Sequence, residues 1–213
     1  MTTSQLKRRT LLQLAAGLAL APGWAHASIE ADEGIDYTVL PQQAPTPVPA
    51  GHVHVIEFFR YGCPFCNRLD PMVQAWKKTL PSHVQFEYVP VSFHSLTHQQ
   101  LFYTLTLMGQ ESRMRAEIFK AIHQSNQGLE LYKDIFEWVL AHGVSGSEFE
   151  RTWHSNEVKS RIEQANALVK AYGISSVPQF GVHGRYVTSP ALVGGDNARA
   201  LQVVEFLIAL ARA

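Results

Sequence analysis

The sequence has no excess of charge of either sign. Its 213 residues include 18 lysines and arginines and 18 aspartates and glutamates, so the formal net charge is zero. A protein that binds nucleic acid needs positive charge to neutralise phosphates, and the composition therefore argues against nucleic acid as a partner. Internal repeats are also lacking, and no apolar run reaches the roughly 20 residues that span a bilayer. We expect one globular domain, or one domain with an insertion, whose chemistry is local.

Cysteine is scarce, since only Cys63 and Cys66 occur. A disulfide between them would close so short a loop that it would remove little entropy from the unfolded chain, which argues against a structural role. Structural zinc sites usually draw their ligands from two such motifs. No second CxxC motif is present, which argues against a structural zinc site. Ten histidines, including His94 and His98 at one-turn spacing, keep a zinc site as the alternative. The pair favours redox chemistry and no metal.

Residues 1–27 are predicted to be a cleaved signal peptide. A basic cluster at 7–9 precedes an apolar stretch at 11–21, and residues 25–27 have the small-x-small pattern of a signal-peptidase site. The stretch is too short for a membrane anchor. We expect cleavage after Ala27, and the basic pair leaves both the general and the twin-arginine export routes open. Removal of three basic and no acidic residues gives the remaining chain a net charge of −3, in surroundings where disulfides persist.

The first half of the remaining chain predicts a strand, helix, strand unit. Apolar runs rich in β-branched and aromatic residues predict strands at 37–40, 53–59 and 84–89. The prolines of 41–49 exclude a helix there. The second run resembles a central strand buried on both faces, with Glu57 as its polar exception. A helical pattern follows it and continues to about Trp76, with a kink expected at Pro71.

The second half predicts a block of helices inserted between two parts of a sheet. From about residue 95 to 172 the apolar spacing is helical, which is typical of core packing rather than of a cofactor groove. A capping box at Ser147-x-x-Glu150 predicts a helix start near Glu148. Strands are expected to return at 179–182 and 185–187, before a last helix at 198–210. The order of elements predicts an α/β fold.

The motif Cys63-Pro64-Phe65-Cys66 follows a predicted strand and opens a predicted helix. The free N–H groups and the dipole of a helix N-terminus stabilise an anion, so the pKa of Cys63 is expected to fall below its ordinary value. Pro64 suits the first helical turn. Cys66 lies one turn deeper on the same face. We therefore expect Cys63 to attack or to be attacked, and Cys66 to resolve.

The sequence resembles the DsbA family of exported thiol:disulfide interchange proteins. The resemblance rests on residues 57–66 with their CxxC motif, on the Val177-Pro178 pair before the returning strands, and on a helical insertion of the expected size. It implies a thioredoxin-like fold with an inserted all-helical domain. It places the thioredoxin-like domain at 28–92 and 173–213, and the helical insertion at 93–172.

The resemblance also implies an activity. The protein would act in the periplasm as a monomer and donate its Cys63–Cys66 disulfide to cysteine-containing exported proteins. A DsbB-like membrane quinone reductase would reoxidise it, and no cofactor beyond its own disulfide is expected. A disulfide isomerase or reductant of the same fold is the alternative, although isomerases usually carry a dimerisation domain for which this chain has no spare length. A redox-inert protein that binds unfolded chains near Phe65 and Pro178 is another.

Three further residues gain roles from the resemblance, and Phe65 departs from it. Pro178 would follow a cis bond beside the disulfide, so that the backbone of Val177 can pair with an extended substrate; otherwise it is a proline at a strand start. Glu57 would be a buried carboxylate that relays a proton to or from Cys66; the alternative is an exposed glutamate on an edge strand. Phe65 stands where the family usually has histidine, so the redox potential is expected to differ.

Overall fold

The computed structural model describes residues 30–212, and the predicted signal peptide lies outside them. Five strands form one sheet in the order β1-β5-β4-β2-β3. Their bounds are β1 (Thr38–Val39), β2 (Val53–Phe59), β3 (Val84–Pro90), β4 (Gln179–Val182) and β5 (Tyr186–Thr188). Strand β2 pairs in parallel with β3, and the remaining pairs are antiparallel. The strands predicted from the sequence are therefore confirmed.

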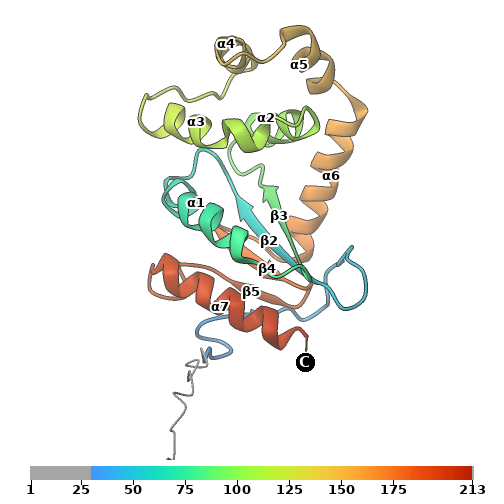
Figure 1. The fold of residues 1–213 in the computed structure, drawn as a ribbon, viewed down its shortest axis with the longest axis vertical. Coiled ribbons are helices and arrows are strands. Elements are labelled where there is room, and N and C mark those ends of the chain that lie inside the picture. Colours follow the sequence, from blue (N-terminus) through green and yellow to red (C-terminus); the bar gives the residue numbers. More distant parts are fainter. Residues whose placement is uncertain (1–29, 213) are drawn as a thin grey trace, which may run out of the picture.

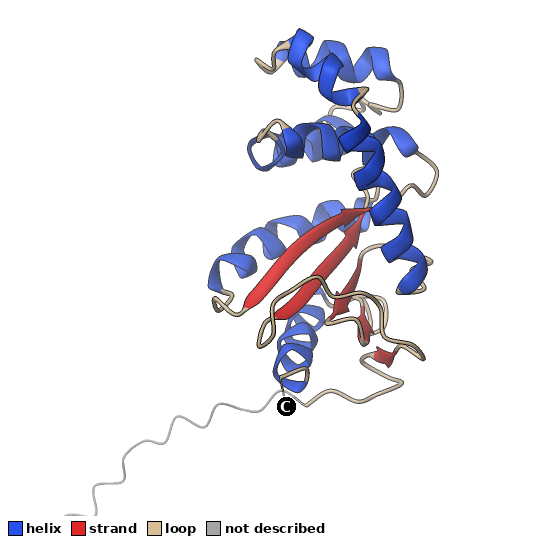
Figure 2. Cartoon of the chain, turned by 90° about the vertical axis from the view of Figure 1, so that its right-hand side faces the viewer, coloured by secondary structure: helices blue, strands red, loops and turns tan. Residues whose placement is uncertain are grey.

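Helices lie around this sheet and above it (Figure 1). Helix α1 (Pro64–Trp76) continues into a 3-10 turn, η1 (Lys77–Thr79), and contacts α7 (Asn197–Leu210). Between β3 and β4 come five helices: α2 (Leu96–Leu107), α3 (Glu111–His123), α4 (Tyr132–Ala141), α5 (Gly146–Trp153) and α6 (Asn156–Ala171). Helix α6 returns the chain to the sheet (Figure 2). The predicted insertion of a helical block between two parts of the sheet is confirmed.

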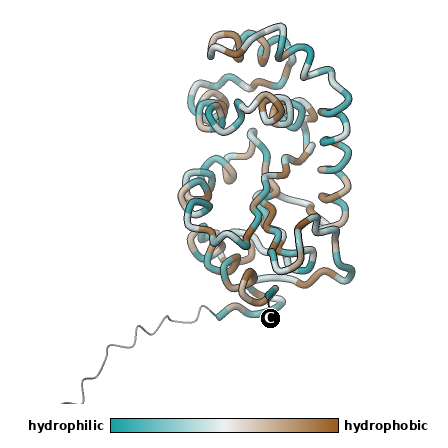
Figure 3. The backbone as a smooth tube through the Cα atoms, turned by 45° about the vertical axis from the view of Figure 1, so that its right-hand side comes forward, coloured by the Kyte–Doolittle hydropathy of each residue, from teal (hydrophilic) through white to brown (hydrophobic). Residues whose placement is uncertain are grey.

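Strand β2 is the centre of the fold, and all seven of its residues are buried. Successive side chains alternate between the two faces of a strand. Val55 packs with α1 and α7 in one apolar cluster, whereas Phe58 belongs to the other cluster and contacts Tyr172 at the end of α6. Apolar residues are accordingly concentrated in the central strands (Figure 3). The expectation of a strand buried on both faces is therefore correct. Because Glu57 follows Val55 by two positions, it faces the same side of the sheet, toward α1.

The start of α5 differs from the expectation based on the Ser147-x-x-Glu150 pattern. The helix begins at Gly146, with Ser145 as its N-cap, and no side chain caps it. A Cβ on Gly146 would lie 2.8 Å from a methyl carbon of Leu140 in α4. Glycine therefore suits the close approach of α4 and α5 at this position, and the helix starts two residues before the expected Glu148. Within residues 30–212, none of the helices combines the length and the apolarity that a membrane crossing requires.

Candidate active site

Cys63 is the N-cap residue of α1. Its backbone is extended, with φ −92° and ψ 118°, and its sulfur accepts the backbone N–H of Cys66 at 3.4 Å. The helix proper begins with Pro64, which loses no hydrogen bond at that position. The Cys63 sulfur therefore lies at the positive end of the helix dipole, as the sequence predicted.

The two cysteines differ in their accessibility. Both are free thiols in this structure; Cys63 is half-buried and Cys66 is only 1% exposed. Phe65, between them, is 60% exposed, and the guanidinium of Arg68 lies 4.5 Å from the centre of its ring. A reagent or a substrate thiolate can therefore reach Cys63 more readily than Cys66.

The two thiols also differ in acidity. The hydrogen bond with the Cys66 side chain, the N–H groups of Cys66 and Phe65, and the charge of Arg60 together lower the pKa of Cys63 to about 6, against the opposing effect of burial. Burial, the hydrogen bond with Cys63 and the Cys63 charge raise the pKa of the Cys66 thiol far above its ordinary value. At neutral pH the thiolate belongs to Cys63.

The loop before β4 lies against the active-site cysteine. The Val177-Pro178 peptide bond is cis, and Pro178 is buried. The Cys63 thiol donates to the carbonyl oxygen of Val177 at 3.4 Å. The structure therefore brings the residue pair that the sequence singled out for substrate binding directly to the CxxC motif, although 114 positions separate Cys63 from Val177.

Glu57 lies in the buried centre of the sheet. Its side chain is 0% exposed, and within residues 30–212 neither carboxylate oxygen has a hydrogen-bond partner. Burial raises the pKa of Glu57 to about 8, while the nearby charge of Arg115 opposes this rise. The Glu57 charge in turn raises the pKa of Cys66. The alternative of an exposed glutamate on an edge strand is wrong, because β2 is covered on both faces and has a neighbour on each side.

Arg60 is a contributor that the sequence analysis did not single out. Its guanidinium donates to the carbonyl oxygen of Phe93 at 2.7 Å and adds a positive charge near Cys63. A Cβ on Gly62 would lie only 2.4 Å from this guanidinium. Gly62 therefore leaves the space in which Arg60 lies against the active-site turn. Both residues fall within 57–66, the segment that resembles the DsbA family, and this resemblance was the only feature of the sequence that could have indicated their role.

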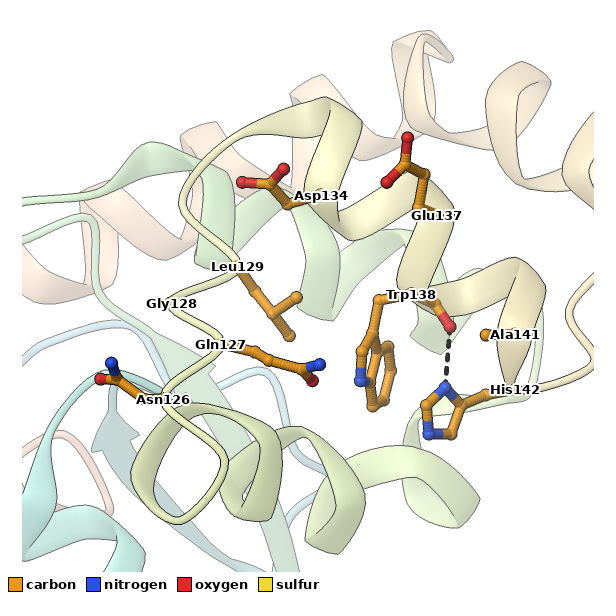
Figure 4. A pocket seen from close by; sticks show the side chains of 9 residues that line it. All are labelled: Asn126, Gln127, Gly128, Leu129, Asp134, Glu137, Trp138, Ala141 and His142. Atoms are coloured by element: carbon orange, nitrogen blue, oxygen red, sulfur yellow. Dashed lines mark hydrogen bonds between the residues drawn. The ribbon is translucent and has the colours of Figure 1, made fainter.

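Other features of the molecule lie apart from the CxxC motif. His94 precedes α2, whereas His98 lies within it and contacts the carbonyl oxygen of Gly128 at 3.0 Å. A pocket of about 540 Å³ lies in the helical block (Figure 4). Its lining comes from the loop at 126–129 and from α4, and it includes Trp138, whose carbonyl oxygen contacts His142. None of the predicted site residues lines this pocket.

A sheet of this order, with a CxxC motif opening the helix after its central strand and a cis-proline loop facing that motif, defines a thioredoxin-like thiol:disulfide oxidoreductase. The five helices between β3 and β4 add the inserted helical domain, so the predicted fold class is confirmed.

Comparisons with known proteins agree with this class. Residues 54–203 match the DSBA-like thioredoxin domain. The chain is 37% identical over 205 residues to the thiol:disulfide interchange protein DsbA of Bordetella parapertussis. The aligned residues cover 95% of this chain and 97% of that protein. It is 38% identical over 177 residues to DsbA of Azotobacter vinelandii, with 82% of each chain covered. The crystal structure of Pseudomonas aeruginosa DsbA superposes with a TM-score of 0.81 at 31% identity, over 85% of this chain and 95% of that one. The chain belongs to the DSBA-like thioredoxin domain family, and it is a protein disulfide oxidoreductase of oxidative folding.

Proposed function

We propose that Cys63 and Cys66 are the residues that exchange disulfides, and that the oxidised pair is donated to cysteine-containing exported proteins. The observation that carries this proposal is the contrast within the pair: an accessible thiol with a pKa of about 6 at a helix N-terminus, and a buried thiol of very low acidity one turn deeper. The Cys63 sulfur is the one that a substrate thiolate attacks and the one that later leaves as a thiolate, whereas Cys66 forms the intramolecular disulfide with it.

The exchange begins when a substrate thiolate attacks the Cys63 sulfur of the oxidised protein. The Cys63–Cys66 bond breaks, a mixed disulfide forms, and Cys66 leaves with the electron pair. Glu57 carries a proton below pH about 8, and it supplies that proton to Cys66, whose buried thiolate is unfavourable. A second substrate thiolate then attacks its own partner sulfur and releases Cys63 as a thiolate. The substrate loses two electrons and gains a disulfide, while the protein is reduced.

The direction of the reaction follows from the stability of the Cys63 thiolate. A low-pKa thiolate is a good leaving group, and its stability favours the reduced protein over the disulfide. The protein therefore acts as an oxidant. Pro64 keeps the first turn of α1 in place, and exposed Phe65 offers an apolar surface beside the attacked sulfur.

The loop before β4 supplies the binding site for the substrate backbone in this proposal. An extended peptide would pair with the backbone of Val177, next to Pro178, by adding a strand-like segment. The contact between Val177 and Cys63 supports this position, because a peptide bound there has its own sulfur within reach of the CxxC motif.

The cellular setting completes the proposal. The signal peptide at 1–27 is cleaved after Ala27, and the mature protein acts in the periplasm as a monomer. Its domains are 28–92 with 173–213 and the insertion 93–172. A DsbB-like membrane quinone reductase reoxidises Cys63 and Cys66, and the disulfide itself serves in place of a cofactor. The family relationship supports the periplasmic setting and the role of the disulfide, and the cleavage site and domain bounds are proposed from the sequence pattern.

The test is turnover of a reduced dithiol peptide by the oxidised full-length mature protein. The parent protein is expected to oxidise the peptide, and Cys63→Ser is expected to lose turnover. Cys66→Ser cannot form the Cys63–Cys66 disulfide and should lose turnover as well; treated with the oxidised form of the peptide, its Cys63 thiolate should give a mixed disulfide. Unchanged peptide binding without any turnover in the parent would favour a redox-inert binding protein. A disulfide that glutathione buffers hardly reduce would favour the reductant alternative.

A further inference from the structure

A buried ion cluster joins α1 to the helical insertion. Arg115 of α3 is only 2% exposed; its Nε donates to Asp70 of α1, and its Nη1 donates to Glu111 at 3.0 Å. The hydroxyl of Tyr61 donates to the same Glu111 carboxylate at 2.8 Å. Buried charges of this kind are costly unless they are paired. The cluster therefore holds the guanidinium of Arg115 in one position.

That position is over the face of the sheet that carries Glu57. The guanidinium carbon lies 3.8 Å from the centre of the Tyr88 ring and 4.1 Å from that of Phe59. Tyr88 is the register partner of Glu57 in the β2–β3 pair, and Phe59 follows Glu57 by two positions. Because register partners and alternate residues share a face, both rings lie beside the Glu57 side chain. Arg115 thus lies over two rings that share the Glu57 face of the sheet.

The hydrogen-bonding capacity on the two sides is complementary. Within residues 30–212, Nη2 of Arg115 is buried without a hydrogen-bond partner, and so are both oxygens of Glu57. The other two guanidinium nitrogens are already paired, Nε with Asp70 and Nη1 with Glu111. Nη2 is therefore the nitrogen of Arg115 that is available to a neighbouring carboxylate.

Other charged and titratable groups face Glu57 from each element packed against it. Asp70 of α1 raises its pKa, as does Cys63, whereas Arg115 and Lys77 of η1 lower it. Lys77 lies 4.9 Å from the centre of the Tyr88 ring but is only half-buried, so water screens its charge. Arg115 is the cation that is both buried and fixed.

We propose that Arg115 is a positioning residue for disulfide exchange: its buried charge, held over Tyr88 and Phe59 by Asp70 and Glu111, acts on the Glu57 carboxyl and sets how readily Glu57 exchanges a proton with Cys66. The inference rests on the proposed role of Glu57. It assigns a function in the exchange reaction to the helical insertion, because the cation comes from α3.

The experiment measures the pKa of Glu57 by carboxyl-carbon NMR in the reduced full-length mature protein, with the resonance assigned from Glu57→Gln. Arg115→Met removes the cation and is expected to raise this pKa by about one pH unit, whereas Asp70→Asn removes an anion and is expected to lower it. Arg115→Lys keeps the charge and should restore most of the parent value. Arg113→Met, on the exposed side of the same helix, is the matched control and should change nothing.

The two main variants shift the pKa in opposite directions, so a general loss of packing cannot imitate the result. If Arg115→Met fails to fold by circular dichroism, Arg115→Gln takes its place as the variant that removes the cation. An unchanged Glu57 pKa in a folded variant that lacks the Arg115 cation would overturn the proposal. The pH profile of mixed-disulfide formation, the step in which Cys66 is released from Cys63, is then compared. A shifted Glu57 pKa with an unshifted profile would support control of Glu57 by Arg115 and contradict the proposed role of Glu57 itself.

Discussion

The Cys63 thiol donates a hydrogen bond of 3.4 Å to the carbonyl oxygen of Val177. A thiolate has no proton to donate, so ionisation of Cys63 ends this bond and leaves the carbonyl free to accept from another group. The same ionisation is favoured by the start of α1 and by Arg60. Activation of the sulfur and release of the backbone acceptor therefore occur together at this site, which suits the binding of an extended peptide.

The first prediction concerns selective alkylation of the reduced protein. Iodoacetamide is expected to label Cys63 rapidly below pH 7, with a half-maximal rate near the pKa of about 6, because the thiolate is the nucleophile. Cys66 should be protected by burial. Mass mapping after brief labelling checks this. Equal or earlier labelling of Cys66 would contradict the division into an attacked and a resolving thiol.

The second prediction concerns the stability of Glu57→Gln. Since the pKa of Glu57 is raised to about 8, the carboxyl contributes most favourably below its unfolded pKa of about 4.3, and this contribution is lost as the pH rises toward 8. The variant should therefore gain in free energy of unfolding over this range, by up to roughly 3 kcal/mol at neutral pH. Urea unfolding between pH 4 and pH 8 measures the gain, with exposed Glu163→Gln as control.

The same variant tests the reaction. Exchange steps that need a proton at Cys66 should slow in Glu57→Gln, because an amide cannot relay a proton. Turnover of the dithiol peptide from pH 5 to pH 8 is the measurement. A profile that superposes on that of the parent would remove Glu57 from the mechanism.

The third prediction concerns the pH dependence of the reduced form. The folded pKa of Cys63 is lowered, so its thiolate adds stability that is complete above the unfolded thiol pKa of about 8.5 and is lost as the pH falls through about 6. The free energy of unfolding of the reduced protein should therefore rise with pH relative to that of reduced Cys63→Ser. Parallel curves for the two proteins would show that the folded thiol has an ordinary pKa.

The fourth prediction concerns Phe65, which carries neither charge nor a polar donor. Phe65→His adds a cation when protonated, so the pKa of Cys63 should fall below about 6 and the disulfide should become more oxidising. Each 30 mV of potential corresponds to about 1.4 kcal/mol. Thiolate absorbance and glutathione equilibration measure the two effects, and Phe65→Leu is the neutral control. An equal or higher pKa in the histidine variant would mean that α1 and Arg60 already supply all the stabilisation.

The local part of the site could be predicted from the sequence. Strand β2 covers 53–59 as expected, and α1 starts at Pro64 directly after the first cysteine. The hydrogen bond from the Cys66 backbone to Cys63 joins residues three apart, so the start of the helix is enough to form it. The amino-acid order by itself therefore determined that Cys63 lies at a helix N-terminus with Cys66 one turn deeper.

Only the tertiary structure decided how the rest of the chain surrounds that pair. The contact of Cys63 with Val177 spans 114 positions, and the cation near Glu57 comes from Arg115 in a helix of the insertion. No local pattern marks Arg115 as buried, since its burial depends on the carboxylate of Asp70 from another helix and on rings from two strands. A helix start is an interaction between near neighbours in sequence, whereas desolvation and the pairing of buried charges depend on elements that meet only when the chain is folded.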